Sequence, residues 1–258
     1  MPGRMAGRVA LVTGGGGGIG EATGRLFAEE GAAVALVDAD ARAVDTAADR
    51  IAKDIAGARV AALTADLARE AEAARVTEAA AARFGALHTL VNVAGVRVYA
   101  ALGDATSADW ERIIGVNVLA TAYCCRAAVP HLRATGRGTV VNVSSVYGVM
   151  GRSGMGQYDT TKAAVLGFTR ALAVEEARHG VRVNAVCPGG TITPYHIRRA
   201  AAQGISEAEM RTQRAGDNLL GRWAEPREMA YPILFLCSDE SSYVTGATLM
   251  VDAGRSII

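Results

Sequence analysis

Residues 9–38 read VALVTGGGGGIGEATGRLFAEEGAAVALVD, and this stretch decides the fold. It begins with a short apolar run, Val9–Val12, passes through a glycine-rich turn into a helix-length segment, and ends in a second apolar run, Val34–Val37. Both runs are nearly continuous in apolar residues, which is typical of strands covered on both faces. A helix between two such strands brings the second strand back parallel to the first through a right-handed crossover.

The same alternation continues to the end of the chain. The later predicted strands are Val60–Leu63, Leu90–Val93, Val140–Val143, Val181–Val186 and Leu249–Val251. The predicted helices are Glu21–Glu30, Asp40–Ile55, Glu70–Phe84, Ala108–Leu132 and Tyr158–His179. This pattern predicts an α/β protein with a doubly wound parallel sheet of about seven strands and helices on both faces. No Pro/Ser-rich linker or internal repeat interrupts it, so residues 1–258 are expected to form a single domain.

Composition narrows the classes of partner. The 258 residues carry 27 Lys plus Arg against 26 Asp plus Glu, which removes any global electrostatic case for nucleic acid or an anionic membrane. The four cysteines (Cys124, Cys125, Cys187 and Cys237) have neither a disulfide framework nor metal-ligand spacing, so no metal is expected. The apolar run at the N-terminus is far shorter than the ~20 residues of a membrane span. We therefore expect a cytoplasmic protein.

The glycine run has the spacing G-x3-G-x-G, formed by Gly14, Gly18 and Gly20. Such a loop lets phosphate oxygens meet backbone N–H groups at the positive end of a helix dipole. This spacing differs from the G-x-G-x-x-G fingerprint, and a flexible turn is the alternative. The strand before the run and the helix after it favour the phosphate-binding interpretation.

Two acidic residues follow the next strands. Asp38 ends the second strand, 18 residues after Gly20, where a carboxylate accepts hydrogen bonds from ribose hydroxyls and repels a 2′-phosphate. No basic residue lies within the glycine run or directly after Asp38, so the sequence predicts NAD over NADP. Asp66 follows the third strand and is either a helix N-cap, a contact to the adenine amino group, or both.

Tyr158 and Lys162 stand four residues apart, on one face of a predicted helix. Only two of the 27 basic residues are lysines, Lys53 and Lys162, so a lysine here is unexpected by composition. A free phenol has a pKa of ~10, but a fixed cation nearby lowers that pKa and makes the group useful for proton transfer. The alternative is an exposed lysine packed beside a tyrosine.

With these motifs, the chain resembles the short-chain dehydrogenase/reductases over essentially its whole length. The matching residues are Thr13-Gly14, Gly18-Ile19-Gly20, Asp66-Leu67, Asn92-Val93-Ala94-Gly95, Asn117, Ser145, Tyr158, Lys162, Pro188-Gly189 and the closing SSYVTGATLMVDAG. Ser145 lies 13 residues before Tyr158, as the family pattern requires. Two positions depart from it: Val93 replaces the second Asn of the usual NNAG, and Ala253 replaces a glycine. Neither departure is at a proton-transfer group.

The resemblance implies a Rossmann-like oxidoreductase with NAD as its cofactor. By this resemblance, Ser145 orients the substrate oxygen and Tyr158 is the general acid/base. Lys162 lowers the pKa of Tyr158 and holds the nicotinamide ribose. Asn117 anchors a water that relays protons. Ser144 is the alternative serine, but Ser145 has the correct spacing. The residues implied for cofactor binding are Gly14, Gly18, Ile19, Gly20, Asp38, Asp66, Leu67, Asn92, Ala94, Gly95, Tyr158, Lys162, Pro188, Gly189, Thr191 and Thr193.

Residues beside the catalytic ones are expected to build the substrate pocket. They are Val96, Arg97, Val146, Arg152, Met155, Gly190, Tyr195 and His196. Residues 193–222 are polar and helix-prone with no strand, and form either a flap over the ligand or an ordinary surface helix pair. The expected substrate is a small secondary alcohol or its ketone. Arg97 and Arg152 permit either a neutral ring or a carboxylated molecule.

Two rival functions share these motifs. A 3-oxoacyl-carrier-protein reductase normally favours NADPH, which Asp38 opposes, and needs a basic patch for its acidic carrier. A catalytically silent, NAD-sensing binding protein has no need for Ser145, Tyr158 and Lys162 together. The resemblance also implies a homotetramer, built on the long helices that carry Asn117 and Tyr158 and on the C-terminal segment.

Overall fold

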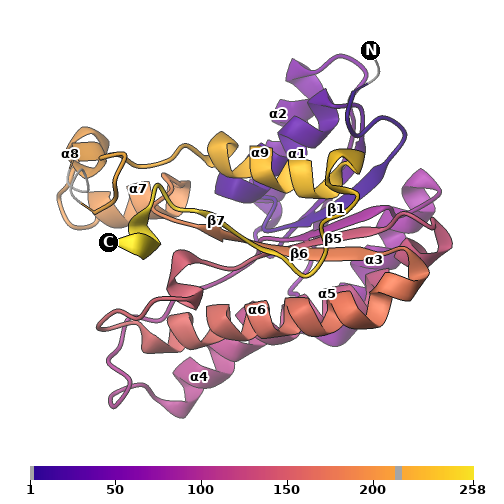
Figure 1. Ribbon diagram of the computed structural model, residues 1–258. Coiled ribbons are helices and arrows are strands. Elements are labelled where there is room, and N and C mark those ends of the chain that lie inside the picture. The colour runs from indigo at the N-terminus through magenta and orange to yellow at the C-terminus, as the bar shows by residue number, and fades with distance from the viewer. Residues whose placement is uncertain (1–2, 213–216) are drawn as a thin grey trace.

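The computed structural model describes residues 3–212 and 217–258. Seven strands form one parallel sheet in the order β3-β2-β1-β4-β5-β6-β7 (Figure 1). They are β1 (Val9–Thr13), β2 (Ala33–Asp38), β3 (Arg59–Thr64), β4 (Thr89–Asn92), β5 (Thr139–Val143), β6 (Arg182–Pro188) and β7 (Thr248–Val251). The order reverses between β1 and β4, and ligands bind at the carboxyl ends of the strands beside such a reversal. The predicted doubly wound sheet is confirmed.

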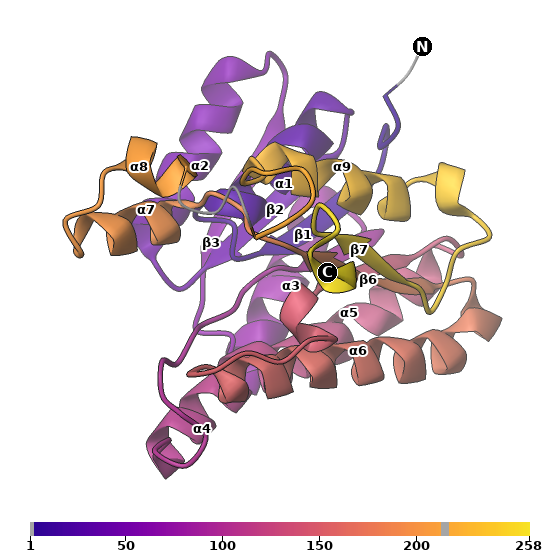
Figure 2. The same ribbon diagram turned by 60° about the vertical axis from the view of Figure 1, so that its left-hand side comes forward.

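Helices cover both faces of the sheet (Figures 1 and 2). One layer contains α1 (Gly18–Glu29), α2 (Ala41–Asp54) and α9 (Pro226–Cys237), and the other contains α3 (Glu70–Phe84), α5 (Ala120–Ala134) and α6 (Gly156–Glu176). A further helix, α4 (Ser107–Ile114), precedes α5. Two short helices, α7 (Pro194–Ala201) and α8 (Glu207–Thr212), stand apart from both layers.

The continuous apolar runs are explained by these two layers. Along β1, Ala10 and Val12 face the core under α1, α2 and α9, whereas Val9 and Leu11 face the core over α3 and α5. Because successive side chains of a strand point to opposite faces, a strand between two helical layers needs apolar residues at every position. All five residues of β1 are buried.

The predicted helices differ from the observed ones in two places. The segment Ala108–Leu132 is not one regular helix, because a π-helical turn, η1 (Gly115–Leu119), lies between α4 and α5. Helix α9 was not anticipated, since its sequence begins with Pro226 and contains Pro232. Pro226 is tolerated in the first turn, where its missing N–H group has no intrahelical partner to lose.

One stretch of the described chain, Ser107–Ala134, is long and apolar enough to cross a membrane by length and composition alone. It comprises α4, η1 and α5, and α5 buries Ala120, Cys124 and Ala128 against the sheet. A core helix of a folded domain has the same composition, so this stretch is no argument for a membrane span.

Candidate active site

The glycine run forms the turn between β1 and α1, and its conformation requires glycine. Gly14 has φ +66°, and a Cβ added to it would lie 2.9 Å from the backbone nitrogen of Ala94. A Cβ on Gly20 would lie 2.0 Å from the carbonyl oxygen of Gly14, so the first turn of α1 packs directly on the loop. Only glycine, without a side chain, permits this approach.

The first turn of α1 fits a phosphate group. Gly17 occupies the N-cap position and supplies no side-chain hydrogen bond, so the N–H groups of this turn are left for a ligand. A Cβ on Gly17 would be in van der Waals contact with Pro194, at 3.5 Å, so the start of α7 lies beside the loop. The residues present therefore suit the pyrophosphate of a dinucleotide.

The carboxylate of Asp38 lies against the glycine loop. It accepts a hydrogen bond from the backbone N–H of Gly16 at 3.0 Å and another from that of Asp40 at 3.1 Å. Each carboxylate oxygen keeps a further acceptor site for a ribose hydroxyl. Asp38 thus shapes the loop and presents a negative charge at the end of β2.

Three predicted cofactor residues, Leu67, Asn92 and Ala94, line one small hollow of about 150 Å³ together with Thr13. The hydroxyl of Thr13 accepts from the N–H groups of Val93 and Ala94 at 3.0 and 3.1 Å, which ties the end of β1 to the end of β4. Both bonds are donated by backbone N–H groups, so the replacement of the usual asparagine by Val93 does not remove them.

Two of the predicted cofactor residues have structural partners. The amide of Asn92 donates to Asn142 Oδ1 at 2.9 Å, so its side chain joins β4 to β5. Asp66 accepts from the N–H of Ala68 at 3.1 Å, whereas the N-cap of α3 is Arg69. The N-cap interpretation of Asp66 is therefore wrong, and its carboxylate closes the turn that precedes the helix.

Tyr158 and Lys162 lie on the first two turns of α6, and both side chains are buried. Lys162 is only 4% exposed. Its Nζ atom donates to the carbonyl oxygen of Val143 at 2.9 Å and lies 5.7 Å from the centre of the Tyr158 ring. A lysine held in this way carries a fixed charge, unlike the exposed lysine of the alternative interpretation.

The electrostatic surroundings favour the phenolate. Burial alone would raise the pKa of Tyr158, but the charges of Lys162, Arg97 and Arg152 and a hydrogen bond from Ser145 outweigh it and lower the pKa. Burial and the nearby charge of Arg97 lower the pKa of Lys162, while the attraction of Tyr158 opposes them. The result is a phenol that loses its proton more readily than a tyrosine in water.

Ser145 stands at the end of β5 and faces the same region. Its hydroxyl accepts from the N–H of Tyr147 at 3.2 Å and caps the short helical turn Val146–Gly148. Ser145 lines the main cavity, whereas Ser144 points into the interior. Of the two candidate serines, only Ser145 is placed to meet a substrate oxygen.

Asn117 lies in the π-helical turn η1 and clamps the loop after β4. Its Oδ1 accepts from the N–H of Val96 at 2.7 Å, and its Nδ2 donates to the carbonyl of Val96 and to Thr161 Oγ1, both at 3.0 Å. A Cβ on Gly95 would lie 3.3 Å from Asn117 Oδ1 and 3.4 Å from Lys162 Nζ. The absence of a side chain at Gly95 therefore keeps the space between the amide and the ammonium open.

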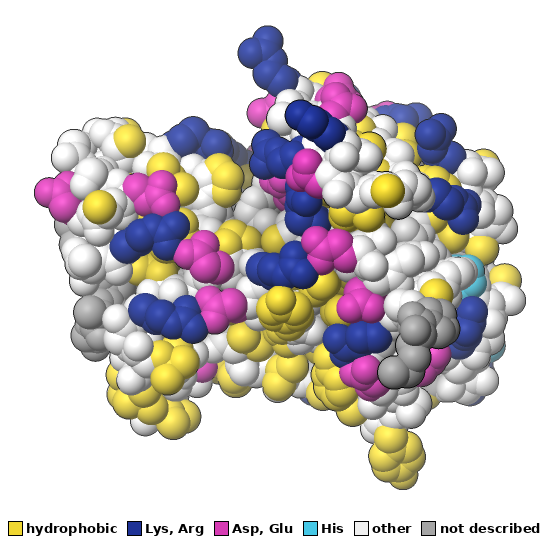
Figure 3. Space-filling model, turned by 90° about the horizontal axis from the view of Figure 1, so that it is seen from above, with side chains coloured by type: hydrophobic (Ala, Val, Ile, Leu, Met, Phe, Trp, Pro, Cys, Tyr) yellow, Lys and Arg dark blue, Asp and Glu magenta, His cyan; other side chains and the backbone are white. Residues whose placement is uncertain are grey.

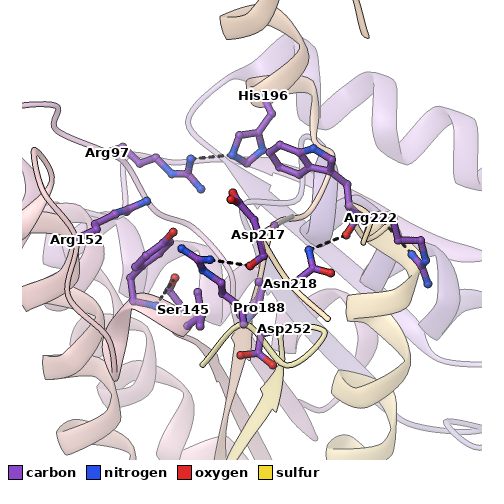
Figure 4. Close-up of a pocket in the computed structure, with 15 residues that line it drawn as sticks. Arg97, Ser145, Arg152, Pro188, His196, Asp217, Asn218, Arg222 and Asp252 are labelled. Atoms are coloured by element: carbon purple, nitrogen blue, oxygen red, sulfur yellow. Dashed lines mark hydrogen bonds between the residues drawn. The ribbon is translucent and has the colours of Figure 1, made fainter. Parts of the chain in front are cut away.

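The main cavity opens beside Ser145 and has an empty volume of about 590 Å³, counted out to its mouth (Figure 4). Seven of the predicted residues line it, namely Arg97, Val146, Arg152, Pro188, Gly189, Gly190 and His196, in addition to Ser145. Tyr158 is not among the residues that line this cavity. The guanidinium carbons of Arg97 and Arg152, which do line it, lie 5.4 and 5.2 Å from the centre of the Tyr158 ring.

Other predicted residues lie outside the cavity wall. Met155 is buried in an apolar cluster with Tyr158, and Val96 packs against the same cluster. The hydroxyl of Tyr195 donates to that of Tyr99 at 2.8 Å, which joins α7 to the loop after β4. Thr193 caps α7, with its hydroxyl 2.9 Å from His196 Nδ1.

The wall also contains seven residues that the sequence analysis did not name one by one, namely Tyr147, Asp217, Asn218, Arg222, Trp223, Asp252 and Arg255. Asp217, Asn218 and Arg222 fall within the predicted flap 193–222, whereas the other four were missed. No local pattern links Trp223 or the C-terminal segment to β5. Among these four, Asp252 has a signal in the sequence, because it belongs to the closing VDAG motif. Of the segment 193–222, positions 213–216 lie outside the described residues.

Comparisons with known proteins agree with this site. A family model described as enoyl-(acyl carrier protein) reductase matches residues 14–256. The cis-4-hydroxycyclohexanecarboxylate dehydrogenase of Sinomonas cyclohexanicum is 41% identical over 255 residues, covering 98% of each chain. The 3-oxoacyl-[acyl-carrier-protein] reductase of Thermotoga maritima is 36% identical, over 98% of this chain and 100% of its own. The crystal structure of L-sorbose reductase from Gluconobacter frateurii, complexed with NADPH and L-sorbose, matches with TM-score 0.95 and 30% identity over 100% of both chains.

These matches extend over the whole sheet and site, and the chain belongs to the short-chain dehydrogenase/reductase family. The predicted family is confirmed. The family uses a nicotinamide cofactor, and the dehydrogenase relative supports an oxidoreductase acting on CH–OH donors.

Proposed function

We propose that this protein is an NAD-dependent dehydrogenase of a small secondary alcohol, in which Tyr158 is the general acid/base. The observation that supports this most directly is the buried pair of Tyr158 and Lys162. The ammonium is held by the carbonyl of Val143, and its charge lowers the pKa of the phenol. A binding protein that only senses NAD gains nothing from burying a lysine beside a tyrosine, because burial of a charge is costly.

Each polar group has a defined part in the oxidation. Ser145 holds the alcohol oxygen, and Tyr158 accepts its proton as the carbinol carbon is oxidised. Lys162 stabilises the phenolate and offers donors to a ribose hydroxyl. Asn117 and the open space at Gly95 connect the ammonium towards a relay water. The nicotinamide, when bound, supplies the hydride acceptor. In the direction of ketone reduction, Tyr158 returns the proton.

NAD is the proposed cofactor because of Asp38. Its carboxylate lies at the end of β2, beside the glycine loop, where a 2′-phosphate would meet a negative charge. The L-sorbose reductase structure contains NADPH, so both nucleotides belong in the test. The name of the Sinomonas relative gives a cyclic secondary alcohol as its substrate, and a molecule of that size suits this cavity.

A 3-oxoacyl-carrier-protein reductase is the second candidate, because the Thermotoga relative has that name. Such an enzyme docks an acidic carrier and so needs a basic surface. On the face formed by α1, α2 and α9, basic and acidic side chains alternate (Figure 3). Ion pairs there join Arg25 to Asp54, Arg50 to Glu21 and Arg227 to Glu29. This face therefore offers no basic patch.

We further propose that residues 1–258 form one catalytic domain in which α7 and α8 are the substrate flap. We also propose that the protein is a homotetramer and acts in the cytoplasm. Helix α6 carries Val174 at 81% exposure, which is compatible with a subunit contact. Sedimentation of the purified protein tests the tetramer.

An initial-rate screen tests the function. The purified protein is assayed with NAD⁺ and NADP⁺ against secondary alcohols, and with a 3-oxoacyl thioester and NADPH. Oxidation of alcohols with NAD⁺ supports the proposal, and faster thioester reduction with NADPH favours the second candidate. Nucleotide binding without turnover of any substrate would contradict both. Tyr158→Phe should retain nucleotide binding while losing nearly all turnover.

A further inference from the structure

Two guanidinium groups stand beside the proposed general acid/base. Arg97, on the loop after β4, and Arg152, before α6, lie with their guanidinium carbons 5.4 and 5.2 Å from the centre of the Tyr158 ring. Both line the main cavity, and both side chains point into it from the same side (Figure 4). A substrate that reaches Tyr158 from the cavity therefore passes next to two positive charges.

The charge of Arg97 has no acidic partner within the described part of the chain. Its Nη1 lies 2.7 Å from His196 Nε2, so the imidazole there is a neutral acceptor. That tautomer is consistent with the 2.9 Å contact between His196 Nδ1 and the hydroxyl of Thr193. The aromatic rings of Tyr158 and Tyr195 and the hydroxyl of Tyr99 also surround Arg97. A partly buried cation without a counter-ion is unfavourable unless an anion joins it.

Arg152 contributes an unused donor. Its Nε pairs with Asp159 at 3.2 Å, so its charge is balanced, and its guanidinium stacks on the ring of Tyr147 at 3.7 Å. Its Nη2 is buried and has no hydrogen-bond partner. A buried N–H group without a partner is rare in folded proteins and is commonly satisfied by a ligand or a water.

The other charged groups of the cavity have partners of their own. Arg222 pairs with Glu228, Arg255 donates to the carbonyl of Asp217, and the carboxylate of Asp252 accepts from backbone N–H groups. The side chain of Asp217 points into the cavity on the side of Arg97 (Figure 4). Among the charged side chains of this wall, Arg97 and Arg152 are therefore the ones proposed to meet an incoming anion.

We propose that Arg97 and Arg152 form a carboxylate-binding site, and that the substrate is a secondary alcohol that carries a carboxylate group. This inference rests on the proposed dehydrogenase function and names its substrate class. One carboxylate oxygen accepts from Arg97 and the other from Arg152 Nη2, while the hydroxyl is directed to Ser145 and Tyr158. The rings of Tyr147 and Trp223 line the same cavity and suit a cyclic carbon skeleton.

A pair of isosteric substrates tests this site. The values of kcat/KM are measured with NAD⁺ for 4-hydroxycyclohexanecarboxylate and for 4-hydroxycyclohexanecarboxamide, which differ in charge and not in shape. The wild-type protein should prefer the carboxylate. Arg97→Gln should reduce that preference by roughly 10- to 100-fold, the range expected for a hydrogen bond to a charged group. Arg97→Lys, which keeps the charge, should restore part of it.

Arg198→Gln is the matched control, since Arg198 is an exposed arginine of α7 outside the cavity wall. This variant should show the same preference for the carboxylate over the carboxamide as the wild-type protein. A wild-type protein that oxidises both compounds equally well overturns the inference. So does an Arg97→Gln variant that loses both activities by the same factor, because Arg97 would then act on Tyr158 alone.

A binding measurement separates this inference from the function on which it rests. Cyclohexanecarboxylate has no hydroxyl group to oxidise, so its binding to the protein with NADH, measured by calorimetry, needs no turnover. Two results together support the site even if no alcohol is oxidised: cyclohexanecarboxylate binds more weakly to Arg97→Gln than to the wild type, and cyclohexanecarboxamide does not bind the wild type as tightly as the acid does. Equal affinity for the acid and the amide overturns the site even if alcohols are oxidised.

Discussion

The hydroxyl of Ser144 donates a hydrogen bond to the main-chain carbonyl of Lys162 over 2.7 Å. This bond fixes the end of β5 to the second turn of α6, next to the point where Lys162 Nζ reaches back to the carbonyl of Val143. The two adjacent serines thus differ in their contacts. Ser144 anchors the helix that carries Tyr158 and Lys162, and Ser145 lines the cavity.

The two serines should therefore respond differently to alanine. Ser145→Ala should lower kcat by roughly 10²- to 10³-fold, because it removes a donor to the reacting oxygen. Ser144→Ala should lower the free energy of unfolding by about 0.5–1.5 kcal/mol, because it removes a buried hydrogen bond while the carbonyl of Lys162 keeps its donor within α6. Steady-state kinetics and urea unfolding of both variants test this. A Ser144→Ala variant that loses more activity than Ser145→Ala would contradict the assignment.

The pH dependence of alcohol oxidation should depend on Lys162. In the proposed mechanism the base is the phenolate of Tyr158, so the rate should rise with pH through the pKa of that group, which the surrounding charges lower. Among these charges, that of Lys162 lowers the pKa of Tyr158 the most. Lys162→Met removes it, so the pKa of Tyr158 should rise and the rising part of the pH–rate profile should move to higher pH. At neutral pH the rate falls by about tenfold for each unit of this shift.

Lys53→Met is the matched control for this change. Lys53 is the other lysine of the chain and is exposed in the last turn of α2. Its loss should leave the pH profile of kcat/KM unchanged. A profile of Lys162→Met that coincides with that of the wild type would show that the ammonium does not tune the phenol.

The fold could be predicted from the sequence, because its strands are marked by local composition. Each strand lies between two helical layers and is apolar throughout, as in β1. The sequence pattern predicted the helices less well at places where the backbone geometry changes but the composition does not. The π-helical turn at Asn117 lies inside an apolar helical segment and depends on the contacts of its side chain with Val96 and Thr161.

The site was predictable only in part, for a physical reason. Residues at spacings fixed by one helix or one turn, such as Tyr158 with Lys162, are neighbours in any fold that contains that element. The pairing of Arg97 with His196, and the position of Trp223 in the cavity wall, depend on where α7 and the later connection cross the sheet. No local pattern contains that information.

The preference for NAD should depend on Asp38. Asp38→Ala removes a charged acceptor for ribose hydroxyls and the charge that repels a 2′-phosphate, so the ratio of kcat/KM for NAD⁺ to that for NADP⁺ should fall by roughly 10- to 100-fold. Asp40→Ala is the control, because it removes the same charge two residues away. Asp40 caps α2 through the N–H of Ala43, so its loss should reduce stability by ~1 kcal/mol and leave the ratio nearly unchanged. Equal ratios in the two variants would refute the ribose contact.

Ala253 should be a site of backbone strain. It has φ +54° and is the one non-glycine residue in the described part of the chain with a positive φ. Alanine in this left-handed region is disfavoured by the contact of its Cβ with the backbone. Ala253→Gly should therefore raise the free energy of unfolding by about 0.5–1 kcal/mol, even though glycine makes the unfolded chain more flexible.

The neighbouring Gly254 gives the opposite control. It has φ +78°, and a Cβ added there would lie 2.5 Å from Leu219 Cδ1, so Gly254→Ala should destabilise the protein through both strain and a clash. Urea unfolding of the two variants and the wild type should shift the midpoint in opposite directions with an unchanged slope. A midpoint for Ala253→Gly at or below that of the wild type would mean that the hydrogen bond from Leu219 to the Ala253 carbonyl, at 2.9 Å, holds this turn without measurable strain.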